Sequence, residues 1–265
     1  MRIMILNFDA AVGSRTGKVR GNNEDNYYFF GRILPLEHTD VATVHRKLKF
    51  TLTEKNSNGF ALAVFDGMGG TENGQTAAYL SARRFKRCLE NHAPELSIRE
   101  CLTDAIGKMN ADVRSFSRKN KYSCGTTAVI LCLLDDRFYV CNVGDSRAYL
   151  LRDGVLIQLS EDHTDAETLK KFGITDQKPH LSQYIGIDEE GEELIPFFSE
   201  GTLQDGDTFL ICSDGLTDMV DTERMGALMQ SSADAKACAE LLLQAAMDGG
   251  GRDNTTLGCV RVTVS

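Results

Sequence analysis

The sequence has little of several features that mark fibrous, low-complexity or membrane-spanning chains. Only four of its 265 residues are proline and its glycines show no period, which excludes a collagen-like or low-complexity chain. No apolar run approaches the roughly 20 residues needed to cross a bilayer. The apolar start lacks a small-residue cleavage site, so it predicts a first strand rather than a signal peptide. We therefore expect a globular, cytoplasmic protein with no membrane partner.

The chain also lacks an excess of basic residues. It has 29 Lys and Arg against 38 Asp and Glu, which gives a net charge of −9. Proteins that bind nucleic acid or anionic membranes draw much of their affinity from neutralising phosphate groups. The composition therefore argues against both partners and raises the question of whether some of the acids bind cations.

None of the eight cysteines forms a C-x-x-C pair, and most lie inside apolar runs, as is typical of buried thiols in a reducing compartment. Cys141 and Arg147 do fit the C-x5-R spacing of cysteine-dependent phosphatases. That loop must bind phosphate through backbone N–H groups and lead into a helix. Here Asp145 lies inside the loop and a strand pattern follows it. We therefore reject this chemistry.

Apolar periodicity divides the chain into runs of strands and pairs of helices. Helices are expected over residues 74–90, 97–117, 221–230 and 234–247, and strands over residues 1–13, 60–66, 126–160 in four pieces, 208–214 and 255–264. Because the helices are segregated from the strands, this order predicts an α+β fold. Residues 31–58 are expected to form a polar connection with weak strand signals, and residues 162–205 are expected to be irregular. We find no repeat and no linker, so residues 1–265 are expected to form one domain.

Acidic residues stand at the ends of several apolar strands. Asp66, Asp145 and Asp214 each end or closely follow such a strand, and Asp253 precedes the last one. A carboxylate at the mouth of a buried strand is costly unless it is paired or binds a metal. Mg²⁺ and Mn²⁺ prefer oxygen ligands, so the pattern predicts a cation site. Asp-Gly pairs are also common turn signals, and Asp153–Gly154, between two evident strands, is expected to be only a turn.

Seven motifs follow one another along residues 13–263: VRGNNEDN, VFDGMGG, CGTTAV, VGDSRAYLLRDG, LSEDHT, CSDGLTD and GGRDNTT. Together they resemble the metal-dependent, type-2C-like serine/threonine protein phosphatases, especially the bacterial members. The resemblance implies a four-layer αββα sandwich, in which two antiparallel β-sheets are flanked by pairs of helices. It also implies a binuclear Mn²⁺ or Mg²⁺ centre and hydrolysis of phosphoserine and phosphothreonine in proteins by a metal-activated water.

The resemblance also assigns metal-binding roles to matching positions. Asp66 would bridge the two metals, and the carbonyl oxygen of Gly67 would bind one of them. Asp214 and Asp253 would hold one metal. Asp145 matches the acid that relatives use together with Asp214 for a third, weaker ion.

The motif near the N-terminus supplies the remaining implied site residues. Arg20 matches the arginine that binds the substrate phosphate, and a guanidinium can clamp a phosphate in bidentate fashion. Glu24 would act on the second metal, directly or through water, with Asp25 in support. The implied catalytic set is therefore Arg20, Asp66 and Asp214.

Two features of the chain depart from or vary within the family pattern. Some relatives have a histidine, proposed as the general acid, where this chain has Met68, which cannot donate a proton. His163 is the nearest alternative by sequence, although we favour a structural role for it. Residues 164–200 occupy the place of the family's variable flap beside the active site.

Bacterial relatives commonly oppose a Ser/Thr kinase, so the resemblance implies such a kinase and its phosphoprotein substrates as partners. The alternative is a non-catalytic pseudophosphatase that acts as a binding or sensing module. Such proteins usually lose metal ligands, whereas the acids are retained here, and this favours an enzyme.

Overall fold

The computed structural model describes residues 4–52, 59–68, 73–91, 96–174, 176–187 and 194–264. The strands of one six-stranded antiparallel sheet are, in spatial order, β11 (Val155–Gln158), β10 (Arg147–Arg152), β13 (Thr208–Cys212), β14 (Thr255–Val264), β1 (Met4–Arg15) and β4 (Val41–Leu52). Those of the second are β12 (Phe197–Thr202), β9 (Arg137–Val143), β8 (Ala128–Leu134), β5 (Phe60–Phe65), β2 (Asn26–Phe29) and β3 (Arg32–Ile33). A short ladder pairs β6 (Gly67–Met68) with β7 (Gly125–Thr126).

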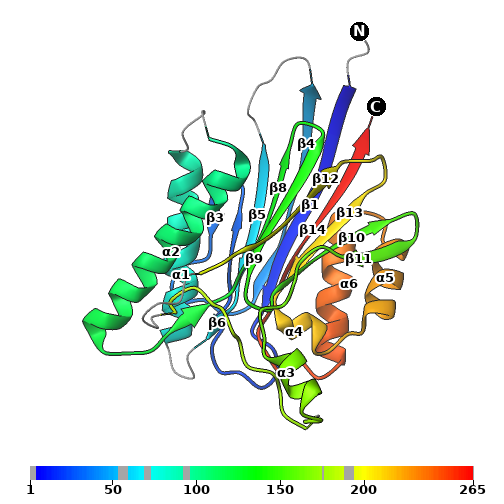
Figure 1. The fold of residues 1–265 in the computed structure, drawn as a ribbon. Coiled ribbons are helices and arrows are strands. Elements are labelled where there is room, and N and C mark those ends of the chain that lie inside the picture. The colour runs from blue at the N-terminus through cyan, green and yellow to red at the C-terminus, as the bar shows by residue number, and fades with distance from the viewer. Residues whose placement is uncertain are drawn as a thin grey trace.

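The two sheets lie face to face, and helices cover both outer faces (Figure 1). Helices α1 (Asn73–Glu90) and α2 (Ile98–Asn120) pack on the second sheet, while α4 (Asp214–Thr217), α5 (Thr222–Ser231) and α6 (Ala235–Asp248) pack on the first. Three apolar layers fill the spaces between these elements, one between the sheets and one under each set of helices. The expected αββα sandwich is confirmed, as are the four expected helices to within a few residues.

Local chemistry explains where the helices begin. Ser97 and Glu100 form a capping box at the start of α2, in which each side chain accepts a hydrogen bond from the other residue's backbone N–H. Asp221 and Asp234 cap α5 and α6 by accepting hydrogen bonds from backbone N–H groups in their first turns. None of the described helices is both long enough and apolar enough to cross a bilayer.

Two connecting segments are more regular than expected. Within residues 31–58, expected to be a polar connection with weak strand signals, Val41–Leu52 form the long edge strand β4, which pairs with β1 along almost its whole length. Residues 53–58 of that segment lie outside the described residues. Within residues 162–205, taken as irregular, Ala166–Lys171 form helix α3 and Phe197–Thr202 form β12. Backbone pairing with β9, rather than apolar periodicity, produces β12.

The antiparallel register brings strand ends from distant parts of the chain to one end of the sandwich. The start of β2 pairs with the end of β5, and the end of β9 pairs with the start of β8. In the other sheet, the end of β13 and the end of β1 both pair with the start of β14. The start of β1 and the end of β14 lie at the opposite end (Figure 1). The acids that follow or precede these strands are therefore gathered in one place.

The layer between the sheets should carry much of the stability. Leu131 on β8 is fully buried there, so we expect Leu131→Ala to lower the free energy of unfolding by about 2–5 kcal/mol through lost burial and the cavity left behind. Urea denaturation measures this change. Ile157→Ala, at an exposed position on β11, is the control and should lower it by less than about 1 kcal/mol. Equal effects would contradict the assigned core.

Candidate metal centre

Acidic side chains from five separate segments meet at this end of the sandwich. Glu24 and Asp25 precede β2, Asp66 follows β5, Asp145 follows β9, Asp214 begins α4 and Asp253 precedes β14. Each of Asp25, Asp66 and Asp145 is close enough to other members of the group for their charges to raise its pKa. The structure therefore gathers the acids that the sequence pointed to.

Asp25 is the most deeply buried of these acids. One carboxylate oxygen, Oδ2, accepts a hydrogen bond of 2.8 Å from the hydroxyl of Ser213. The other, Oδ1, is buried and has no hydrogen-bond partner among the described residues. Burial, aided by Asp214 and Asp253, raises the pKa of Asp25 to about 7. An orphaned carboxylate oxygen in the interior is a costly feature that a bound cation would relieve.

Hydrogen bonds hold the backbone of Asp66 on both sides and so fix the point from which its side chain extends. Its N–H donates to the hydroxyl of Thr127, and its carbonyl oxygen accepts from the N–H of Thr127 and the hydroxyl of Thr126, all within 3.1 Å. Burial raises the pKa of Asp66 well above the ordinary range, and the neighbouring acids raise it further. This is the expected response of a carboxyl group placed among like charges.

Gly67 lies where only a glycine fits. A Cβ atom there would lie 2.5 Å from the carbonyl oxygen of Glu24, and it would also clash with the start of α1. The N-terminal loop, β6 and α1 are therefore in close contact at this point. The carboxylate of Glu24 lies over the first turn of α1, since a Cβ on Gly74 would meet its Oε2 at 2.7 Å.

Asp145 lies in the tight connection between β9 and β10. Gly144 adopts a positive φ of 98° there, a conformation that glycine tolerates. Burial raises the pKa of Asp145 to about 6, Asp214 adds to the rise and Lys178 opposes it. The N–H of Gly144 donates to Nδ1 of His163, and the N–H of His163 donates to the carbonyl of Gly144. His163 therefore holds this connection in place, as the favoured structural role requires.

Arg20 and Asn254 join the N-terminal loop to the segment before β14. The Arg20 guanidinium pairs with Asp253 at 2.6 Å, at a partly exposed position. Asn254 donates hydrogen bonds of 2.8 Å to the carbonyls of Thr16 and Asn22 and accepts one of 2.8 Å from the N–H of Glu24. The sequence analysis missed this role of Asn254, although its position beside Asp253 was a signal.

Lys178 is a second basic residue at the site and was not among the residues predicted from the sequence. Its ammonium lies 2.8 Å from Oδ2 of Asp214 and 3.0 Å from Oδ2 of Asp218. Burial disfavours the charge, but the two carboxylates outweigh that cost and raise the pKa of Lys178. Lys178 comes from the flap-like segment 164–200, of which residues 175 and 188–193 lie outside the described residues.

As placed, no three Asp, Glu, His or Cys side chains in the described ranges are spaced to hold a metal ion. Asp214 and Asp253 instead bond to Lys178 and Arg20. The donor set still fits divalent cations, because its members offer oxygen atoms only, repel one another and include the orphaned Oδ1 of Asp25. Asp25, Asp66, Asp214, Asp253 and the Gly67 carbonyl are therefore candidates to hold Mn²⁺ or Mg²⁺.

The surroundings of Cys141 do not support a cysteine-dependent phosphatase. Burial raises the pKa of the Cys141 thiol, whereas a nucleophilic cysteine needs a lowered one. Arg147 begins a strand rather than a helix and is bonded to Asp162 at 2.6 Å. All eight cysteines lie in described parts of the chain, are free, and six are buried, as expected. Asp153–Gly154 is the hairpin turn between β10 and β11, as expected.

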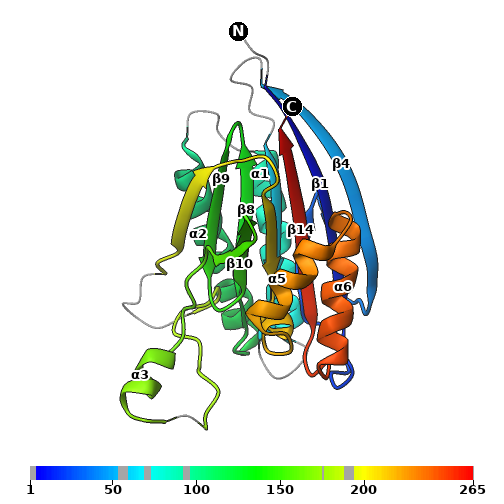
Figure 2. The ribbon, with the colours of Figure 1, turned by 90° about the vertical axis from the view of Figure 1, so that its right-hand side faces the viewer.

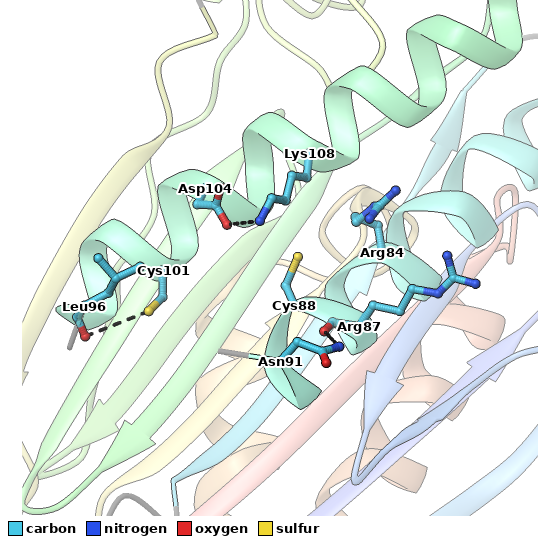
Figure 3. Close-up of a pocket in the computed structure, with 8 residues that line it drawn as sticks. All are labelled: Arg84, Arg87, Cys88, Asn91, Leu96, Cys101, Asp104 and Lys108. Atoms are coloured by element: carbon cyan, nitrogen blue, oxygen red, sulfur yellow. Dashed lines mark hydrogen bonds and ion pairs between the residues drawn. The ribbon is translucent and has the colours of Figure 1, made fainter. Parts of the chain in front are cut away.

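A cavity of about 300 Å³ lies away from the acids, between α1 and α2 (Figure 3). Its lining is mixed and includes the cations Arg84, Arg87 and Lys108. Two of these cations are already paired, Arg84 with Asp112 and Lys108 with Asp104. None of the sequence-derived site residues lines the cavity, so it is separate from the candidate metal centre.

Comparison with known proteins agrees with this geometry. The family model described as Protein phosphatase 2C matches residues 36–189. The serine/threonine protein phosphatase PstP of Mycobacterium tuberculosis is 30% identical over 260 residues, which cover 93% of this chain and 43% of PstP. The chain thus spans less than half the length of that relative. The serine/threonine phosphatase stp of Listeria monocytogenes is 28% identical over 257 residues, which cover 91% of this chain and 90% of stp.

Among solved structures, the catalytic domain of PstP in complex with two manganese ions superposes with a TM-score of 0.76. The two are 27% identical in sequence, and the match covers 97% of this chain and 99% of that domain. The sandwich described above is therefore an architecture that holds two manganese ions in PstP.

The burial of Asp25 predicts how the free energy of unfolding depends on pH when EDTA removes divalent cations. Folding raises the pKa of Asp25 from 3.8 to about 7, so the folded state binds more protons than the unfolded state between these values. The free energy of unfolding should therefore fall as pH rises from about 4 to about 7. Urea midpoints measured in EDTA at pH 5 and pH 7 test this, and Asp25→Asn should shrink the difference between them. An unchanged difference in the variant would contradict the assigned burial of the charge.

Proposed function

We propose that this chain, which belongs to the protein phosphatase 2C family, hydrolyses phosphoserine and phosphothreonine in proteins with the help of divalent cations. The observation that carries the proposal is the convergence of acids from five segments beside one exposed arginine. Such a group binds cations and phosphate at adjacent points. The proposal treats residues 1–265 as one phosphatase domain.

In this proposal the acids at the strand ends hold the cations. Asp66, the carbonyl of Gly67, Asp214 and Asp253 would bind them, with Glu24 and Asp25 in support. When bound, the cations supply an activated water and neutralise charge on the phosphate. Asp145 would serve a third, weaker ion.

Other side chains of the site contact the phosphate and position the acids. Arg20 is paired with Asp253 and about half exposed, so it can turn its guanidinium toward an incoming phosphate. Ser213 holds the carboxylate of Asp25, and Thr126 and Thr127 hold the backbone of Asp66, so both residues are positioned before substrate arrives. Met68 lies beside the site on β6 and cannot donate a proton, so the leaving oxygen must take its proton from elsewhere.

We also propose that the substrates are phosphoproteins, that a Ser/Thr kinase opposes this chain, and that the chain acts in the cytoplasm. Eight free cysteines, six of them buried, support a reducing compartment. A non-catalytic binding role is the alternative. The complete set of acids and the phosphatase names of the relatives favour an enzyme over that alternative.

Phosphate release from a phosphothreonine peptide tests the activity. We expect release in millimolar Mn²⁺, none in EDTA, and a loss of at least about a hundredfold in Asp66→Asn, because that carboxylate cannot be replaced by a neutral amide at a cation site. Asp153→Asn, which changes an acid in the β10–β11 turn, is the control and should keep full activity. Metal-loaded, folded protein that releases no phosphate would favour the binding role.

Arg20→Ala tests the phosphate contact separately. We expect it to raise KM for the phosphopeptide at least about fivefold, because a charge-assisted contact to the phosphate is lost. Arg20→Lys should recover only part of the effect, since lysine lacks the planar fork. Lys18→Ala, at an exposed cation two positions away, is the control. An unchanged KM in Arg20→Ala would remove this residue from the site.

A further inference from the structure

The flap-like segment leaves and rejoins the sandwich through a hydrogen-bonded neck. On the outgoing side, the N–H of Asp165 donates to the carbonyl of His180 at 3.0 Å. On the returning side, the N–H of Ser182 donates to the carbonyl of His163 at 2.9 Å, and His163 is itself bonded to Gly144. The neck is therefore fixed directly beside the candidate metal centre.

Within the neck, the described residues 166–174 and 176–179 have few contacts with the sandwich. Helix α3 has no buried residue and stands away from the sheets (Figure 2). Lys178, two positions before His180, extends from this segment to the centre. Its ammonium bonds to Asp214 and Asp218, which lie 36 and 40 positions further along the chain. Lys178 is therefore both an anchor for the segment and a positive charge at the acids.

This position conflicts with a bound dication. Asp214 is only 17% exposed, and one of its two carboxylate oxygens is occupied by the ammonium at 2.8 Å. A divalent ion on the other oxygen would lie within a few ångströms of that positive charge, and the two would repel. The ammonium also lies close enough to Asp145 to lower the pKa of that acid, so its influence extends over two acids of the site.

We propose that Lys178 is a positioning residue that competes with the divalent cation for Asp214 and thereby couples the flap-like segment to metal binding. Without metal, the ammonium neutralises Asp214 and holds the segment against the centre. When a cation binds, the ammonium is displaced and the segment loosens. This inference rests on the proposed function, because it takes Asp214 as a metal ligand.

Calorimetric titration with Mn²⁺ tests the competition. Lys178→Met removes the charge and keeps a long, flexible side chain. We expect it to bind Mn²⁺ at least about fivefold more tightly than the wild type, the lower end of typical coupling between sites. Lys178→Arg should restore affinity toward the wild-type value. Lys171→Met removes an exposed cation of α3 and should leave the affinity unchanged. Lys178 is itself 59% exposed, so these variants are expected to fold.

Because coupling is reciprocal, Mn²⁺ binding should weaken the contact of Lys178 with Asp214 by the same factor by which that contact weakens Mn²⁺ binding. Hydrogen exchange in peptides covering His163–Phe172 should accelerate when Mn²⁺ is added to the wild type. In Lys178→Met it should already be fast without Mn²⁺ and change little. A lysine with a purely structural role would not make exchange depend on Mn²⁺.

The outcomes separate this proposal from the proposed function. Equal Mn²⁺ affinity in the wild type, Lys178→Met and Lys171→Met overturns the competition, even if the enzyme turns over normally. A wild type that binds no Mn²⁺ and releases no phosphate overturns the proposed function and this inference together. Tighter Mn²⁺ binding in Lys178→Met alone, reversed by arginine, supports the proposal.

Discussion

Carboxylates gathered at one end of the sandwich repel one another, and this repulsion shapes the whole site. Asp25 and Asp66 have no ion-pair partner in the part of the chain that is described, and burial raises the pKa of both. Such a group persists only if it is protonated or if cations offset its charge. Arg20 and Lys178 offset part of that charge at the rim. The interior of the group is left for divalent ions.

The fold holds the acids together at the ends of paired strands rather than on one flexible loop. Antiparallel pairing places the ends of β1, β5, β9 and β13 at the same end, next to the starts of β2 and β14. Short polar contacts then fix individual acids, as the Ser213 hydroxyl does for Asp25. Asn254 fastens the loop that carries Glu24 to the segment that carries Asp253. The apolar layers hold these ends in register, which links stability to function.

The sequence was sufficient for much of this arrangement, because buried strands and amphipathic helices leave strong periodic patterns and the acids directly follow the strands. It was insufficient for β4. The apolar residues of that strand that pack on the core, Val41, Val44 and Leu48, are not spaced in strict alternation, since the pairing with β1 shifts register near Val12 and Ser14. It was also insufficient for Lys178, whose partners lie far along the chain and are reached only through the folded neck. Both features depend on tertiary contacts that no local pattern records.

Thermal unfolding with and without Mn²⁺ tests whether the buried acids are assembled to bind divalent cations. A ligand that binds only the folded state raises its melting temperature. We expect the wild type to melt at a higher temperature in millimolar Mn²⁺ than in EDTA, and we expect Asp66→Asn to lose most of that difference. A wild type whose melting temperature does not change with Mn²⁺, or an equal rise in Asp66→Asn, would contradict this expectation.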